Sequence, residues 1–212
     1  MEPYFWSFQS EKGTSMEQAQ VKELLFQSLE HERGGIQVYE NAIQCALTED
    51  LKEEWGRYLE QTRNHERILL RVFQELGLNA EEQSPGRGIV KQLGQALVQA
   101  MQTAKRAGKP EAAELVACEC VVLAETKDHA DWELISKAAD KSMGKQKATL
   151  QAAADEVEEQ EDEHLYHSKG WCRELWIQSL GMKAVLPPPE ERKHVTTAIG
   201  AARAEQESEK RR

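Results

Sequence analysis

The sequence has few of the residues that interrupt helices or cross-link chains. Its 212 residues include 13 glycines, 6 prolines and 4 cysteines, and no two cysteines have CxxC spacing. A chain this poor in glycine and proline is unlike proteins built from many short strands and turns. The cysteines lack the spacing of a metal or disulfide motif, so we expect buried free thiols in a reducing compartment. The expected location is the cytoplasm.

The sequence also lacks an excess of basic residues and a long apolar run. The formal net charge is -10, and the acidic residues are spread along the whole chain. Without a basic stripe to neutralise phosphates, we expect neither nucleic acid nor a membrane surface as a partner. No stretch approaches the roughly 18 apolar residues typical of a membrane span, and the first residues are not basic. We therefore predict neither a signal peptide nor a transmembrane helix.

Helix-forming residues dominate the rest of the sequence, with apolar residues repeating every three or four positions. The pattern predicts an all-α protein with one domain over residues 16–182. A flexible N-terminus (1–15) should precede this domain, and a flexible, proline-containing tail (183–212) should follow it. The long helices are expected at about 16–46, 49–77, 110–140 and 145–180, with an extra helix at about 89–107. Leu180 is expected to face inward at the end of the last one.

The connections between these helices predict how they are arranged. A three-residue polar turn at 48–50 joins the first two long helices, which should therefore be antiparallel neighbours. A much longer segment, broken at Pro85 and containing the extra helix, separates the second long helix from the third. The sequence therefore predicts an antiparallel four-helix bundle with a long crossover.

Five ionisable residues interrupt the apolar stripes of the four long helices. A buried carboxylate without a partner costs several kcal/mol, roughly, or becomes protonated, so each interruption needs a physical reason. Carboxylates and imidazoles that converge from four helices can be satisfied by sharing a divalent metal ion. The five candidate metal ligands are Glu32, His65, Glu125, Glu161 and His164.

The spacing of these residues strengthens the hypothesis of a metal site. Glu161 and His164 are three residues apart, so they point the same way from one helical turn. Thr62 and His65 repeat this offset in the second long helix, where a threonine stands in the carboxylate position. An aromatic residue also follows seven positions after Glu32 (Tyr39) and after Glu125 (Trp132). These repeats indicate two similar helix hairpins that face each other.

With these motifs the chain resembles the ferritin-like superfamily, in particular the rubrerythrin-type di-iron or di-manganese carboxylate proteins with the order Glu, ExxH, Glu, ExxH. The resemblance covers about residues 16–182 and implies metal-ligand roles for the five residues. It also implies iron or manganese, as one or two ions, and redox chemistry with oxygen, peroxide or a small substrate. No rubredoxin-like pair of CxxC motifs is present. Besides a small-molecule oxidant or substrate, a second copy of the chain in a homodimer is an expected partner.

Thr62 departs from the resemblance, because that position normally supplies a carboxylate. A two-metal site with an open position, a single-metal site and an empty, degenerate site all remain alternatives. Without metal, the five residues would form a hydrogen-bonded network inside a helical scaffold that binds a partner.

Several neighbouring residues have two interpretations each. Gly34 and Gly35 leave room either for a substrate beside the site or for close helix packing. Asp128 and His129, one turn beyond Glu125, are candidates for recruitment to the metal. Tyr39 is either core or an electron relay near the metal, and His167 is expected to be a hydrogen-bonded histidine at the edge of the core.

Overall fold

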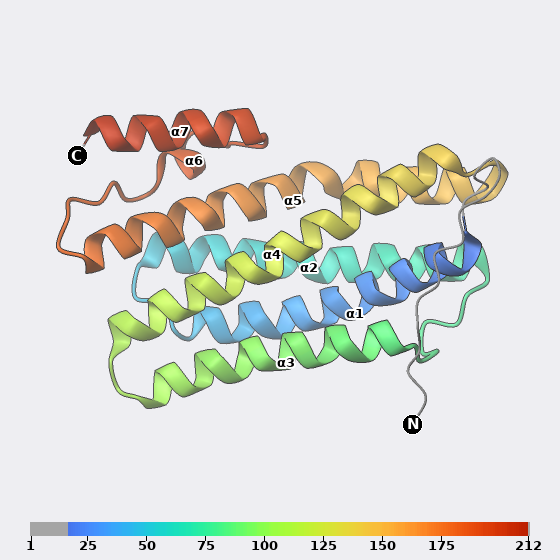
Figure 1. The fold of residues 1–212 in the computed structure, drawn as a ribbon, viewed down its shortest axis with the longest axis horizontal. Coiled ribbons are helices and arrows are strands. Elements are labelled where there is room, and N and C mark those ends of the chain that lie inside the picture. Colours follow the sequence, from blue (N-terminus) through green and yellow to red (C-terminus); the bar gives the residue numbers. More distant parts are fainter. Residues whose placement is uncertain (1–16, 212) are drawn as a thin grey trace, which may run out of the picture.

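The structure is a computed structural model, and it describes residues 17–211. The expected N-terminal segment 1–15 lies outside the described residues. All regular elements in the described range are helices, and five of them are long (Figure 1). The helices are α1 (Gln18–Ile43), α2 (Glu49–Leu76), α3 (Pro85–Arg106), α4 (Pro110–Lys141), α5 (Gly144–Ser179), α6 (Pro189–Arg192) and α7 (Ala198–Arg211).

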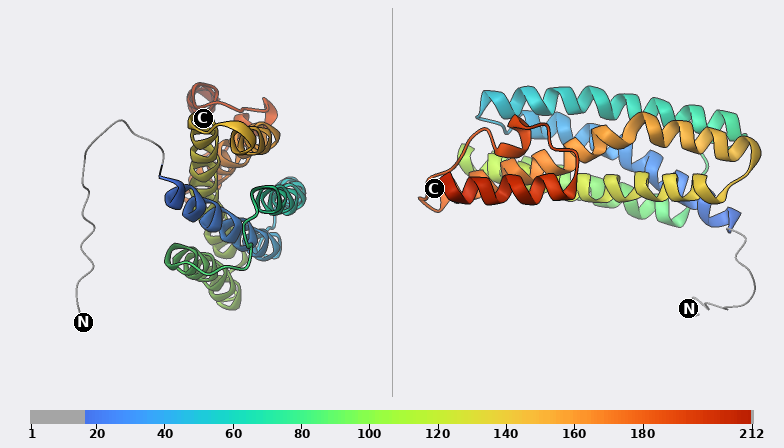
Figure 2. Two further views of the ribbon diagram at one scale, coloured as in Figure 1. Left: turned by 90° about the vertical axis from the view of Figure 1, so that its right-hand side faces the viewer. Right: turned by 90° about the horizontal axis from the view of Figure 1, so that it is seen from above.

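The long helices pack side by side as a bundle and run in alternating directions along the chain (Figure 1). Helices α1, α2, α5 and α4 contact one another in a ring, each touching the next. Helix α3 packs on the outside of this ring, against α1 and α4, and returns the chain from the end of α2 to the start of α4. Figure 2 shows α3 at the edge of the molecule opposite α7. The connection from α2 to α4 therefore consists mainly of one long helix, α3.

Local sequence signals define the ends of these helices. Ser84 caps α3, because its hydroxyl oxygen accepts a hydrogen bond from the backbone N–H of Arg87 at 3.1 Å. Pro85 and Pro110 occupy the first turns of α3 and α4, where a missing N–H costs nothing. Gly77 ends α2 in the left-handed conformation at φ 69°.

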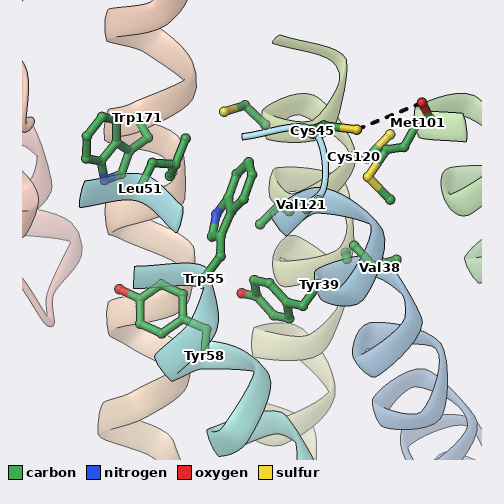
Figure 3. Close-up of a cluster of buried hydrophobic side chains, with 14 of the residues drawn as sticks. Val38, Tyr39, Cys45, Leu51, Trp55, Tyr58, Met101, Cys120, Val121 and Trp171 are labelled. Atoms are coloured by element: carbon green, nitrogen blue, oxygen red, sulfur yellow. Dashed lines mark hydrogen bonds between the residues drawn. The ribbon is translucent and has the colours of Figure 1, made fainter. Parts of the chain in front are cut away.

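Two apolar clusters fill the bundle on either side of its middle. The Trp55 cluster lies toward the junction of α1 with α2, and Figure 3 shows the Trp55 side chain above those of Tyr39 and Tyr58. The Phe73 cluster lies toward the other end. Between them, every ring helix carries one or more of the five candidate ligands. The Trp55 cluster includes Val38, Tyr39, Leu51, Trp55, Tyr58, Val121 and Trp171, and the Phe73 cluster includes Leu25, Leu29, Leu69, Phe73, Trp132, Leu150 and Val157.

Close contact between helix backbones explains the paired glycines of α1. A Cβ atom built on Gly94 of α3 would lie 3.4 Å from Cα of Gly34, so the two helices meet at these residues. A Cβ on Gly35 would lie 3.2 Å from Cγ2 of Thr62 in α2. Both glycines therefore allow close helix packing, which is the second of the two interpretations.

The segment expected to be a flexible tail (183–212) contains helices α6 and α7 within its described residues. Helices α6 and α7 pack against α5 and bury Val185, Val195 and Ala204. Glu190 is 1% exposed and accepts two hydrogen bonds from the Arg173 guanidinium of α5, at 2.7 and 3.1 Å. The segment has few apolar residues of its own, so it is ordered by the contacts that α5 provides.

Leu180 does not face the core. It follows the last residue of α5, Ser179, and is 65% exposed. The apolar period that predicted an inward position for Leu180 no longer applies beyond the end of the helix, because Gly181 turns the chain at φ 77°.

Among the described residues, no helix combines the length and the apolar character needed to cross a membrane.

Replacing Gly170 should detach the C-terminal helices. A Cβ there would lie 2.8 Å from Oε2 of Glu190 and 3.0 Å from Cβ of Pro188. We expect Gly170→Ala to lower the free energy of unfolding by about 1–3 kcal/mol through overpacking, and to speed proteolysis of residues 185–211. Gly56→Ala is the control, because a Cβ at Gly56 meets nothing within 4 Å among the described atoms. It should stabilise α2 by up to about 1 kcal/mol. Equal proteolysis of both variants would contradict this account of how α6 docks.

Candidate metal centre

All five candidate ligands point into the middle of the ring and are buried. Glu32, His65 and His164 are 0% exposed, Glu161 is 1% exposed and Glu125 is 3% exposed. They form two groups with ligand atoms within 4.8 Å of one another, one of Glu32, His65 and Glu161 and one of Glu125, Glu161 and His164. Glu161 belongs to both groups. The structure therefore brings together two buried Glu/His triads that share one carboxylate, and each could hold a metal ion.

The ligand atoms of the triads are close together but do not hydrogen-bond. Nδ1 of His65 lies 2.8 Å from Oε1 of Glu161, and Nδ1 of His164 lies 3.3 Å from Oε2 of Glu125. Within residues 17–211 none of these four atoms has a hydrogen-bond partner, and neither do Oε2 of Glu161 and Oε2 of Glu32. Buried polar atoms are nearly always partnered. Six unpartnered atoms that converge on one region fit a cation that would bind them.

A glutamine orients each histidine from the outside. Nε2 of His65 lies 2.9 Å from Oε1 of Gln160, and Nε2 of His164 lies 2.8 Å from Oε1 of Gln61. An amide oxygen only accepts, so each Nε2 carries the proton and donates it. In the neutral imidazole each Nδ1 would then present a lone pair to the centre, which is the form of histidine that binds metals.

The two aromatic residues of the hairpin repeat each donate to the opposite half of the centre. The Tyr39 hydroxyl of α1 donates to Oε1 of Glu125 in α4 at 2.8 Å. Trp132 of α4 donates from Nε1 to Oε1 of Glu32 in α1, also at 2.8 Å. Each bond satisfies one oxygen, and the other oxygen of that carboxylate is buried without a hydrogen-bond partner among the described residues. Tyr39 and Trp132 therefore belong to the core and also fix the two terminal carboxylates.

Thr62 contributes no ligand atom toward the triads. Its hydroxyl donates to the backbone oxygen of Tyr58 at 2.9 Å, a bond within α2. Its methyl group lies on the side of Gly35, as the 3.2 Å separation from a Cβ at that glycine shows. The side of the centre that is symmetric to Glu161 is therefore closed by a methyl group instead of a carboxylate.

Asp128 is a further buried carboxylate beside the centre. It is 3% exposed, and its Oδ1 has no hydrogen-bond partner among the described residues. It lies three residues after Glu125 and four before Trp132 on α4, and both of those side chains reach the centre. The two triads do not include it. His129 instead points to the edge, where its Nδ1 lies 3.5 Å from Oδ1 of Asp162.

Burial shifts the pKa values of the centre in opposite directions for acids and bases. The pKa of Glu161 lies well above its usual value because of burial and the nearby charge of Glu125. Burial and the charge of Asp128 raise the pKa of Glu32 in the same way. The pKa of His164 is lowered, mainly by burial. The protein alone therefore disfavours charge on these three groups, and bound cations would reverse this for the two carboxylates. The pKa of Glu125 is instead lowered, because the interactions with His164 and the hydrogen bond from Tyr39 outweigh its burial.

A second buried polar cluster lies next to the centre, under α6. Glu54 is 0% exposed and accepts hydrogen bonds from the Tyr58 hydroxyl at 2.5 Å and from Nε1 of Trp171 at 2.5 Å. Nδ1 of His167 lies 2.9 Å from the same carboxylate. The Tyr58 ring packs on the ring of His164, with centroids 4.1 Å apart. His167 is thus a hydrogen-bonded buried histidine.

Two kinds of functional residue were missed at the sequence level. Gln61 and Gln160 both lie four residues before a ligand histidine, giving a Q-[T/E]-x-x-H repeat that a search for internal similarity would reveal. Glu54 lies one turn before Tyr58 in the second apolar stripe, so its inward position could be read from helical periodicity. Its partner His167 is 113 residues away, and nothing in the spacing pairs them.

Comparisons with protein-family models, with curated proteins and with solved structures found no match for this chain. What the chain does must therefore be argued from its own geometry.

Glu191 of α6 should make the stability of the protein depend on pH. Burial and the charge of Glu54 raise its pKa from 4.5 to about 7. The folded state then keeps a proton that the unfolded state has lost, so stability falls as pH rises between these two values. We expect Glu191→Gln to raise the melting temperature relative to wild type at about pH 8 and to change it little at about pH 4. Glu209→Gln, at an exposed position of α7, is the control for circular dichroism melts. The same shift at both pH values would refute the assignment.

Proposed function

We propose that the chain is a ferritin-like metalloprotein that binds iron or manganese at its two Glu/His triads and uses the metal for redox chemistry with oxygen or peroxide. The observation that carries this proposal is the set of unpartnered atoms around Glu161. Both of its oxygens and Nδ1 of both histidines lack hydrogen-bond partners within the described chain. A metal-free network would be expected to join some of these atoms by hydrogen bonds, whereas Nδ1 of His65 and Oε1 of Glu161 lie 2.8 Å apart without one.

The donor types support a borderline or hard metal ion. Carboxylate oxygens and imidazole nitrogens suit iron, manganese and zinc, whereas none of the four cysteines belongs to either triad. Bound iron or manganese would supply one-electron redox chemistry that the amino acids lack. The residues of the chain hold the ligands in place: Gln61 and Gln160 orient the histidines, and Tyr39 and Trp132 orient the terminal carboxylates.

With Asp128 included, the negative charges of the carboxylates would equal the positive charges of two divalent metal ions. Glu32, Glu125 and Glu161 carry three negative charges when ionised, and Thr62 adds none. A fourth carboxylate at Asp128 would balance two divalent cations, and its unpartnered Oδ1 is buried beside the centre. Of the charges around Glu32, that of Asp128 raises the pKa of its carboxyl most, which supports their proximity. We therefore include Asp128 in the proposed site.

The competing function is a helical scaffold that has lost its metal together with the carboxylate at position 62. Thr62 favours this alternative, because its hydroxyl is bonded within α2 and its methyl group lies against Gly35. A scaffold should tolerate apolar residues in place of the buried Glu/His set, and often gains stability from them. Metal content separates the two functions.

Removing both histidine ligands should abolish metal binding. We expect wild-type protein from iron- and manganese-supplemented medium to contain one or two metal ions per chain, measured by inductively coupled plasma mass spectrometry. His65→Ala/His164→Ala should contain metal only at background level, because each triad loses its nitrogen ligand. The control is His129→Ala/His194→Ala, which removes two histidines outside the triads.

Thermal melts extend this test. Metal that binds the folded state should raise the melting temperature of wild type and of the control, but not that of the ligand variant. Background metal in wild type, or equal metal in both double variants, would favour the scaffold.

Changing Asp128 should affect one metal ion of the two. We expect Asp128→Asn to weaken the binding of the second ion by about tenfold to a hundredfold, measured by titration with Mn²⁺. Asp131→Asn is the matched control, since Asp131 is also buried on α4 but is ion-paired with Lys127 at 2.6 Å. Thr62→Glu added to Asp128→Asn should restore the second ion by returning a carboxylate to the centre. Unchanged binding in Asp128→Asn would remove Asp128 from the site.

A further inference from the structure

An apolar pocket opens on the outer surface of the ring, close to the metal centre. Its volume is about 280 Å³, and α1, α3 and α4 form its walls. Two leucines at this pocket are unusually exposed for their type, Leu93 at 54% and Leu123 at 62%. The apolar lining consists chiefly of Val38, Val90, Leu93, Leu97, Leu123 and Ala124. Exposed apolar surface gathered around a cavity indicates a binding site.

The polar groups of the pocket are already paired with other parts of the protein. Glu30 accepts a hydrogen bond from Arg87 at 2.8 Å, and Lys127 donates to Asp131 at 2.6 Å. Nε2 of His31 lies 3.0 Å from the backbone oxygen of Ala124, to which it donates. A charged ligand would compete with the partners of these groups, whereas an uncharged hydrocarbon ligand would leave the bonds intact.

The inner wall of the pocket is also the outer wall of the metal centre. Gly35 lines the pocket, and a Cβ on it would lie 3.2 Å from the methyl group of Thr62. His31 and Ala124 line the pocket as well, and each directly precedes a triad carboxylate, Glu32 and Glu125. The pocket therefore lies on the side of the centre that has no carboxylate in position 62.

We propose that this pocket binds a small, uncharged and largely hydrocarbon molecule, aromatic or aliphatic, and holds it beside the Thr62 side of the metal centre. The proposal deepens the proposed function, on which its second half rests, by giving the centre a class of substrate. The volume lies just below the roughly 300–1,000 Å³ of sites for drug-sized ligands, so the molecule should be smaller than those. A cavity with its polar groups paired favours such a molecule over a protein partner, which would place polar backbone there.

Fluorobenzene, followed by fluorine NMR, is the probe for both halves. We expect saturable binding to wild type and an at least tenfold weaker affinity for Leu93→Glu/Leu123→Glu, which places charge at the mouth of the pocket. Both leucines are exposed, so the variant should fold. Leu134→Glu/Ile199→Glu is the matched control, because these residues are also exposed, at 48% and 67%, but lie outside the pocket. It should bind the probe like wild type.

Adding metal to the same experiment tests whether the pocket lies beside the metal centre. Mn²⁺ bound at the triads is paramagnetic and should broaden the fluorine signal of the bound probe more than Zn²⁺ does. His65→Ala/His164→Ala should bind the probe but show no extra broadening. The Mn²⁺ and Zn²⁺ samples must each be shown to contain the metal at the triads. Equal broadening of the fluorine signal in the two samples would overturn the link between pocket and centre.

The remaining outcomes are equally decisive. No saturable binding, or the same affinity in Leu93→Glu/Leu123→Glu, would overturn the pocket itself while leaving the proposed metal function intact. Wild type that sediments as a dimer and becomes monomeric in this variant would assign the surface to a second copy of the chain, which also overturns the proposal. Failure of wild type to bind either Mn²⁺ or iron would overturn the proposed function and the link to the centre, and the probe titration would still decide the pocket.

Discussion

The centre of this bundle depends on the burial of Glu161 between two histidines. Its carboxyl group is 1% exposed, lies 2.8 Å from Nδ1 of His65 and 3.6 Å from Nδ1 of His164, and has no hydrogen bond to either oxygen within the described chain. Burial alone pushes such a group toward its neutral form. A shared cation would remove that cost and satisfy both histidines at the same time. The ring of four helices is arranged so that all three side chains meet there.

The surroundings of the centre keep water out and hold the ligands still. The Trp55 and Phe73 clusters close the bundle on both sides, which gives a low local dielectric and strengthens every electrostatic interaction inside. The bonds that fix these side chains join neighbouring helices of the ring: α1 to α4 through Tyr39 and Trp132, and α2 to α5 through Gln61 and Gln160. Packing of the helices and orientation of the ligands therefore depend on each other.

The two halves of the centre have matching residues that orient the candidate ligands, but the candidate ligands themselves do not match. The two halves share the Q-x-x-x-H repeat and the exchanged aromatic donors, yet Thr62 stands in the position that corresponds to Glu161. On the Thr62 side the wall is a methyl group and Gly35, and beyond it lies the apolar pocket. The carboxylate that could compensate, Asp128, comes from α4 instead. The side of the centre that lacks a carboxylate at position 62 is therefore also the side of the apolar pocket.

The sequence alone predicted that the five candidate ligands face inward, because each residue turns the side chain by about 100° around its own helix. That period selects Glu32, His65, Glu125, Glu161 and His164 without any knowledge of the fold, and it predicts an all-α bundle. It also leaves Asp128 and His129 as alternatives, and the structure buries Asp128 at 3% exposure while His129 pairs with Asp162 at the edge.

Tertiary structure decided everything that requires a partner on another helix. The pairs Gln160 with His65 and Glu54 with His167 depend on how α2 crosses α5, which no local period encodes. The same holds for α6 and α7, whose buried Val185, Val195 and Ala204 are too widely spaced to form a stripe and become core only against α5. Periodicity determines the direction of a side chain around the axis of its own helix. Contacts between side chains of different helices are determined by how those helices pack together.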